Sequence, residues 1–175
     1  MTTQRQRLRK AGLLCLHCLR NIAFYRAAQD ARPWPEPQQF WRTASNNFLD
    51  VAVLEWCKIF VDEKAKHHWK KLVGKHEQFE AGLLEKLRIT NLMFEDFSEE
   101  IRVYRNKFVA HLDDENEMHI PNLVPAVKSA QFLYQWLHDA EDDCNAFGDA
   151  PQNAVTFYRE FLNQGRAVCD ASKAA

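Results

Sequence analysis

The amino-acid sequence predicts a single all-α domain, an up-and-down bundle of four to five main helices with additional short helices. Three observations lead to this prediction. The chain has 175 residues, of which 46% are hydrophobic, enough for a sizeable core. Only 5 glycines and 6 prolines occur, too few for the many turns of a β fold. Between them, apolar residues recur at helical spacing.

The first predicted helix covers residues 3–29. Its apolar positions form one stripe, made of Leu8, Ala11, Cys15, Cys18, Leu19 and Ile22. Residues 33–37, with the sequence Pro-Trp-Pro-Glu-Pro, cannot continue a helix and form a stiff connection. A second helix is predicted over residues 38–61. Its broad apolar face indicates a central helix that touches several neighbours.

The remaining elements follow from polar breaks and capping residues. Residues 64–88 predict one or two short helices divided near Gly74. Thr90 or Asn91 can cap the next helix, whose core stripe consists of Phe94, Phe97, Ile101, Tyr104 and Phe108. Residues 113–117 break that helix, and Pro121 opens another that ends near Ala140. A last helix follows the turn at 148–151, so the predicted domain spans residues 1–170 and residues 171–175 form a loose tail.

Charge and cysteine content narrow the class of protein. A formal net charge of -1 gives no general attraction for polyanions, but residues 1–32 carry seven basic side chains against Asp30 alone. A basic first helix either faces a nucleic acid or partner or is an ordinary solvated face. The odd number of cysteines and the apolar neighbourhoods of Cys15, Cys18 and Cys57 predict reduced, buried thiols in a cytoplasmic protein. For the CxxC of Cys15 and Cys18, core packing is a better interpretation than a redox or zinc site. No segment has the length of a membrane span.

The segment YRNKFVAHLDD holds the residues best suited to chemistry. Counted at about 100° per residue from Phe94, Arg105 falls at the edge of the core stripe, where an arginine needs an anionic partner. His111 falls at the opposite edge, about 9 Å away along the helix and about 120° around it. The two could hold one phosphate only if the helix ends before His111, or if a second chain of a symmetric dimer supplies the complementary residues.

Such a cluster suits metal-independent cleavage of RNA. A histidine can take a proton from a ribose 2′-hydroxyl and return one to the leaving 5′-oxygen. An arginine can hold the phosphoryl oxygens, and Asn106 could orient a water, a phosphate or the histidine. The predicted catalytic residues are therefore Arg105, His111 and Asn106, with Arg102 and Lys107 as RNA contacts. We expect no metal and no other cofactor.

The same segment resembles a known family. Arg105-Asn106 followed by Ala110-His111, late in an aromatic-striped helix, resembles the R-x4-6-H signature of the HEPN superfamily of small helical ribonucleases. The stretches NNFLDVAVLEWCKIF and YRNKFVAHLDD are similar to its AbiU-type abortive-infection branch, most closely over residues 46–60 and 97–114.

This resemblance implies an HEPN-like bundle that forms a homodimer, in which the arginines and histidines of both chains meet in a shared cleft. It implies that Arg105 and His111 are catalytic and that Asn106 is the polar residue of the motif. It also implies a toxin or phage-defence effector that cuts RNA and is restrained by an antitoxin or another regulatory protein.

Two alternatives stay open. The same cleft could belong to a catalytically inactive helical module that binds a protein partner or a nucleotide. A metal phosphohydrolase could instead use the scattered histidines, which are His67, His68 and His76 together with the pair His138-Asp139. Their spacing matches no recognisable ligand set, and a solvated basic loop explains the first three better.

Two carboxylates interrupt the apolar second helix. Asp50 and Glu55 are the predicted counter-ions for Arg105 or Arg102, because a charge near the core needs an opposite charge. We expect this role to be structural.

Overall fold

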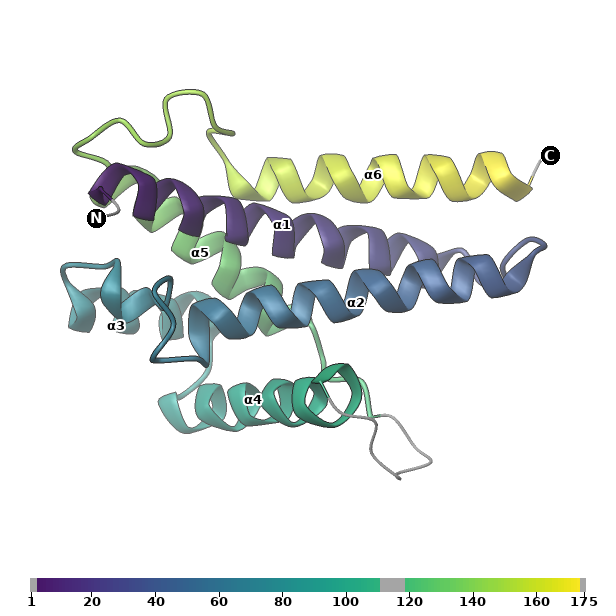
Figure 1. The fold of residues 1–175 in the computed structure, drawn as a ribbon, viewed down its shortest axis with the longest axis horizontal. Helices are drawn as coiled ribbons and strands as arrows, with labels where there is room; N and C mark the ends of the chain where they lie inside the picture. The colour runs from purple at the N-terminus through teal and green to yellow at the C-terminus, as the bar shows by residue number, and fades with distance from the viewer. Residues whose placement is uncertain (1–2, 111–118, 174–175) are drawn as a thin grey trace.

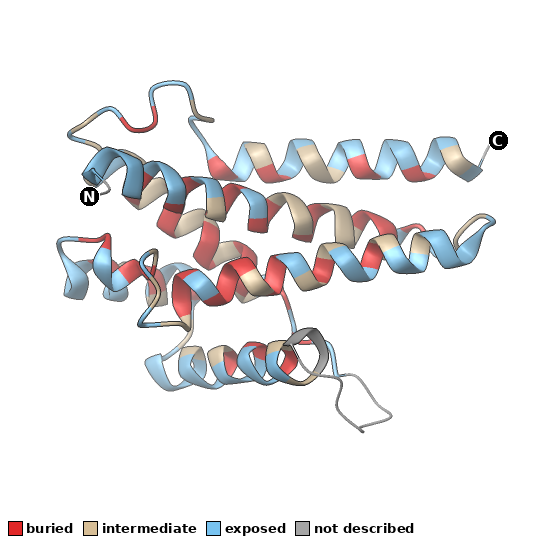
Figure 2. Ribbon diagram, viewed as in Figure 1, coloured by how far each residue is buried: buried red, intermediate tan, exposed pale blue. Residues whose placement is uncertain are grey.

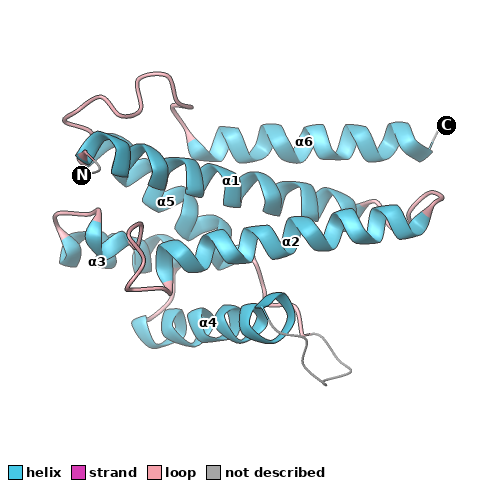
Figure 3. Cartoon of the chain, in the orientation of Figure 1, coloured by secondary structure: helices cyan, strands magenta, loops and turns pink. Residues whose placement is uncertain are grey.

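The computed structural model describes residues 3–110 and 119–173, and every regular element in these two ranges is helical. The helices are α1 (Gln4–Asp30), α2 (Gln38–Phe60), α3 (His76–Leu87), α4 (Asn91–Tyr104), α5 (Val124–Ala140) and α6 (Ala154–Lys173), with a 3-10 turn η1 (Trp69–Lys71) and a π-helical segment η2 (Arg105–Ala110). The predicted all-α class is confirmed, and Figure 3 shows the helices and the loops that join them.

The helices are arranged in neighbouring rows (Figure 1). α6, α1 and α2 lie side by side, and α4 lies on the far side of α2 from α1. α5 packs against α1 and α3, and the two ends of the chain lie at opposite ends of the long axis. Within the described ranges, no helix combines the length and the apolar character that crossing a membrane requires.

α1 is the central helix of the bundle. It begins with a capping box, in which the Thr3 hydroxyl accepts from the Gln6 backbone N–H and the Gln6 side chain accepts from the Thr3 N–H. α2, α5 and α6 all pack against it. Buried residues therefore recur along α1 from Leu8 to Ala28 (Figure 2). Cys15 and Cys18 lie in this core as free thiols, so the predicted packing role of the CxxC is confirmed.

Basic side chains of α1 form hydrogen bonds with the C-terminal part of the chain. Arg9 donates to Asp149 in the loop before α6 at 2.8 Å, and Arg26 donates to the Tyr158 hydroxyl on α6 at 3.1 Å. The basic first helix is therefore not a uniform solvated face, because part of its charge is used to fix the C-terminal part of the chain.

α2 touches several neighbours, as its broad apolar face predicts. α1 packs on one side of it, and α4 and η2 pack on another. Trp56 is 1% exposed, and its indole N–H donates to the Ser129 hydroxyl of α5 at 2.9 Å. Its rings also contact an aromatic group made of Phe60, Phe94 and Phe97.

The segment between α2 and α4 forms η1 and α3, with Gly74 between them, so the predicted division is confirmed. His68 is 1% exposed, and its Nδ1 accepts from the Lys70 backbone N–H at 3.4 Å. Its Nε2 is therefore the donor to the Phe60 carbonyl, at 3.1 Å. The prediction of a solvated loop is wrong for His68, because this ring joins the end of α2 to η1.

Two helix ends differ from the prediction. α5 begins at Val124, three residues after Pro121, and the Asn122 side chain just before it accepts from the Val124 N–H at 3.0 Å. α6 continues to Lys173, past the predicted start of a loose tail at residue 171. Cys169 is 5% exposed, so the last turns of α6 still have a packed side. The predicted core position of Phe108 concerns a side chain outside the described part of the structure.

Candidate functional site

Arg105 is the first residue of η2, directly after α4. It forms an ion pair with Asp62, which lies two residues after the end of α2. Its Nη1 donates to Asp62 Oδ1 at 2.6 Å, and its Nε donates to Asn106 Oδ1 at 3.1 Å. The Arg105 side chain is 18% exposed and that of Asp62 is 38% exposed. The guanidinium thus has the anionic partner that its position requires.

The partner of Arg105 differs from the two predicted counter-ions. Asp50 accepts a hydrogen bond from the Tyr104 hydroxyl at 2.9 Å, while Glu55 lies against α1. The prediction failed because Asp50 is engaged by the neighbouring Tyr104 and Glu55 faces α1, whereas Asp62 follows the end of α2 and reaches the first residue of η2. The only sequence signal for Asp62 is the polar break that it begins.

Cys57 lies against the same guanidinium. The thiol is 0% exposed, and burial raises the pKa of Cys57 to about 12, although the charge of Arg105 acts in the opposite direction. Such a thiol stays protonated at neutral pH and is not a nucleophile. Burial acts to lower the pKa of Arg105, but the hydrogen bond and charge of Asp62 raise it overall, so the guanidinium stays charged.

The other predicted site residues of this segment surround Arg105 along the chain. Asn106 is exposed and accepts the hydrogen bond from Arg105. Arg102 forms an exposed ion pair of 2.6 Å with Glu99, one turn earlier on α4. Lys107 is half-buried in η2. The structure therefore brings Arg105 and Asn106 together, and it engages Arg102 with a carboxylate.

The helix type changes at Arg105. Residues 105–110 form a π-helix, whose i→i+5 hydrogen bonds give a wider turn than an α-helix. The count of about 100° per residue therefore does not apply between Arg105 and His111. His111 lies outside the described residues, so its approach to Arg105 stays a prediction. Single π-helical turns are frequent at functional sites.

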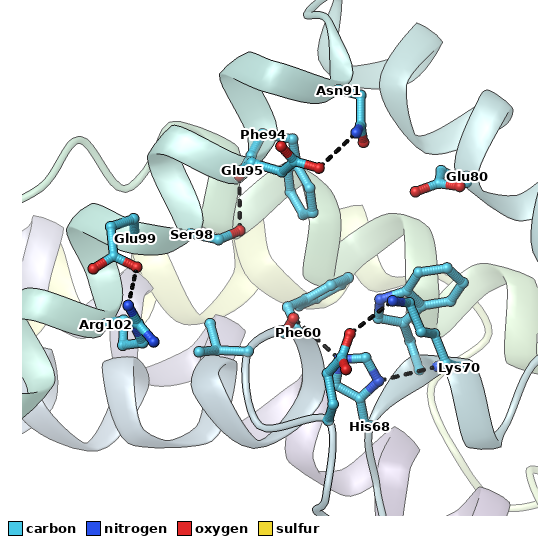
Figure 4. Close-up of a pocket in the computed structure, with 13 residues that line it drawn as sticks. Phe60, His68, Lys70, Glu80, Asn91, Phe94, Glu95, Ser98, Glu99 and Arg102 are labelled. Carbon is cyan, nitrogen blue, oxygen red and sulfur yellow. Dashed lines mark hydrogen bonds and ion pairs between the residues drawn. The ribbon is translucent and has the colours of Figure 1, made fainter.

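A pocket of about 320 Å³ opens beside Arg102, between α4 and the segment after α2 (Figure 4). Its polar lining comprises Glu63, Glu80, Glu95, Glu99, Asn91, Ser98, His68, Lys70 and Arg102. Both cations already have carboxylate partners, since Lys70 lies 2.7 Å from Glu63 and Arg102 lies 2.6 Å from Glu99. Carboxylates outnumber cations here, so the pocket would repel a phosphate group.

The scattered histidines have separate surroundings. His138 Nδ1 lies 2.8 Å from the neighbouring Asp139 carboxylate and packs beside the Tyr134 and Phe147 rings. His76, the first residue of α3, packs edge-on against the Trp69 ring of η1. Among the residues that the structure describes, no three His, Cys, Asp or Glu side chains gather in a way that could hold a metal ion.

Comparisons with protein-family models, with curated proteins and with solved structures find no match for this chain. The fold and the site define the protein as an all-α bundle with a charged, partly buried arginine at the joint of α4 and η2. Membership of the HEPN superfamily therefore stays a prediction from sequence resemblance.

Proposed function

We propose that this protein is a metal-independent endoribonuclease of HEPN type that acts in the cytoplasm as a toxin or phage-defence effector. The observation that carries the proposal is the fixed guanidinium of Arg105, which Asp62 and Asn106 hold at the start of a π-helical turn. A guanidinium held in this way can receive phosphoryl oxygens with little loss of side-chain entropy. His111 follows six residues later in the chain.

In the proposed reaction, His111 takes the proton from a ribose 2′-hydroxyl, and the 2′-oxygen attacks the adjacent phosphorus. The bond from phosphorus to the 5′-oxygen breaks, and that oxygen receives a proton from a second imidazole or from the same one. The products are a 2′,3′-cyclic phosphate and a 5′-hydroxyl. Arg105 stabilises the added negative charge on the phosphoryl oxygens, and Asn106 orients Arg105 through its side-chain oxygen.

The proposal includes a homodimer and a restraining partner. A symmetric dimer would bring two copies of Arg105 and His111 to one cleft and supply a separate imidazole for each proton transfer. An antitoxin or other regulatory protein would cover that cleft. Because the Arg102 pocket carries an excess of carboxylates, we place the RNA on the η2 side of Arg105.

The test is cleavage of a labelled RNA in EDTA, followed on a denaturing gel. We expect cleavage by the wild-type protein to leave a 2′,3′-cyclic phosphate. Arg105→Ala and His111→Ala should each lower the rate by at least about a hundredfold, the scale of a lost catalytic proton donor or charge. Arg166→Ala and His76→Ala are matched controls, since Arg166 is ion-paired with Asp30 on the opposite side of the bundle.

A second variant separates catalysis from folding. Asp62→Asn keeps the size of the side chain and an oxygen that can accept the hydrogen bond from Arg105, but it removes the negative charge that competes with phosphate. We expect it to bind RNA at least as tightly as wild type and to remain active. Equal rates for wild type, Arg105→Ala and His111→Ala in EDTA would rule out the proposal.

One observation favours the second candidate, a catalytically inactive module that binds a protein or nucleotide. The ion pair between Arg105 and Asp62 is also what a purely structural arginine would form. If this candidate is right, RNA stays intact with every variant, and both Arg105→Ala and Asp62→Asn lower the melting temperature. A pull-down would then recover a stable complex with intact RNA or with a partner protein.

A further inference from the structure

A group of exposed cations lies where the first half of α1 meets the end of α2 and the segment 64–71. Arg7 joins these elements, because its Nη2 donates to the Lys71 carbonyl at 2.7 Å. Lys10, Lys58 and Lys66 are exposed, and none forms an ion pair with another described residue. Arg7, Lys10, Lys58 and Lys66 are called the α1–α2 cationic surface below.

The charges of these four cations all act on His67, in the segment that the Arg7 hydrogen bond ties to α1. The ring is half-buried, and its pKa is lowered first by burial and then by the charges of Lys10, Arg7, Lys66 and Lys58. A side chain on which four cations act must lie within electrostatic reach of all of them. Residues far apart in the sequence therefore form a single positive region.

Nearby carboxylates do not neutralise this region. Asp62 is ion-paired with Arg105, and Glu63 is ion-paired with Lys70. Glu55 is buried, and burial raises its pKa to about 7, so its carboxyl offsets the charge of Lys58 only in part at neutral pH. The lysines thus keep their charge for a ligand, even though the formal charge of the whole chain is only -1.

We propose that the α1–α2 cationic surface binds the phosphate backbone of single-stranded RNA. The choice of RNA as the partner rests on the proposed function, whereas the preference for phosphates rests on the cations alone. Arg7 and Lys10 are about 4.5 Å apart along α1 at 1.5 Å per residue, and Lys58 and Lys66 extend the surface onto the end of α2 and the segment after it. Lysines act as point charges, so we expect little dependence on base sequence.

The test measures binding of a fluorescent 2′-O-methyl RNA oligonucleotide by anisotropy over a series of salt concentrations. This RNA lacks the attacking hydroxyl, so binding is measured without cleavage. The variant combines Lys10→Gln, Lys58→Gln and Lys66→Gln. Its control combines Lys86→Gln, Arg159→Gln and Lys173→Gln, which removes the same charge from exposed positions on α3 and α6.

We expect the surface variant to bind more weakly and to lower the slope of log K against log salt by about 2, or about 0.7 for each lost phosphate contact. The control should keep the wild-type slope. Equal slopes for both variants would overturn the proposal. The proposal would also be overturned if the protein bound phosphatidylserine-containing vesicles in a co-sedimentation assay but did not bind the oligonucleotide.

A second measurement uses His67 as an internal reporter. Phosphates on the surface would offset the charges that lower the pKa of His67, so RNA should raise this pKa in an NMR titration. His67→Gln identifies the resonance. A pKa of His67 that the oligonucleotide does not change would contradict the proposal.

Failure of this proposal is distinguishable from failure of the proposed function. If Arg105→Ala loses cleavage while the surface variant keeps both cleavage and wild-type RNA binding, only the proposal of the cationic surface is rejected. If RNA binding depends on the surface lysines but neither wild type nor any variant cleaves RNA, only the nuclease proposal is rejected.

Discussion

Glu55 is an ionisable residue whose protonation is tied to folding. Its side chain is 10% exposed, and its Oε1 lies 3.3 Å from His17 Nδ1. Its Oε2 is buried and has no hydrogen-bond partner among the described residues. Burial raises the pKa of Glu55 to about 7, although the charges of Lys58 and Arg20 oppose the rise. The carboxyl therefore gains or loses its proton close to neutral pH.

We expect Glu55→Gln to change how stability depends on pH. Between the ordinary pKa of 4.5 and about 7, the folded wild-type protein keeps a proton that the unfolded chain releases. The Glu55 contribution to the free energy of unfolding is therefore complete below pH 4.5 and is lost as pH rises through about 7. The full loss is about 3 kcal/mol, and Glu55→Gln should escape it.

Urea unfolding at about pH 5 and at about pH 8 measures this effect. The variant should gain stability relative to wild type at the higher pH. Burial and Arg20 lower the pKa of His17, which makes a contribution of opposite sign. The double variant His17→Gln/Glu55→Gln, compared with His17→Gln alone, isolates the contribution of Glu55. Glu77→Gln, on the exposed side of α3, is the control. A difference that stays constant with pH would show that Glu55 is ionised throughout.

At the level of elements, the contact of α6 with α1 depends on one glycine. A Cβ added at Gly165 would lie 2.7 Å from the Ala27 Cβ and 3.1 Å from a Phe24 ring atom. An alanine Cβ cannot move aside, so α6 must shift away if this position carries any side chain. The close approach also explains how a helix with few buried residues stays attached to the bundle.

We therefore expect Gly165→Ala to lower stability, although alanine favours the helix. The gain in helix propensity is about 1 kcal/mol, and overpacking costs about 1–3 kcal/mol. The variant should lose about 1 kcal/mol in urea unfolding. Asn163→Ala, on the exposed side of the same helix, is the control and should not lose stability. If both variants gain stability alike, α6 does not pack closely on α1.

At the level of the whole molecule, a buried hydrogen bond joins the first half of the chain to the second. The Trp56 indole N–H donates to the Ser129 hydroxyl across 73 positions of sequence. Ser129 in turn donates to the Ala126 carbonyl at 3.1 Å, and it is 0% exposed. This bond links α2 to α5 inside the core.

Ser129→Ala should lower the free energy of unfolding by about 1–3 kcal/mol, because the indole N–H would be buried without an acceptor. Thermal unfolding followed by circular dichroism measures it. Ser98→Ala is the control, since the Ser98 hydroxyl donates only within α4, to the Phe94 carbonyl. Equal melting temperatures for the two variants would show that the Trp56 bond contributes nothing.

The sequence by itself determined the helices and their order. Thr3 and Thr90 cap α1 and α4, Gly74 separates η1 from α3, and the apolar stripes predict which faces are buried. These features are local, because helical hydrogen bonds and caps join residues three to five positions apart. A window of sequence therefore contains the interactions that decide them.

Only the tertiary structure decided the partners of the charged residues. Arg105 pairs with Asp62 across 43 positions, and Glu55 faces His17 across 38 positions. The sequence instead predicted Asp50 and Glu55 as the counter-ions for Arg105 or Arg102. Which carboxylate an arginine reaches depends on how the helices cross, on their rotation and on the helix type after Tyr104. The packing of the entire core sets these quantities, and no short segment of the chain encodes them.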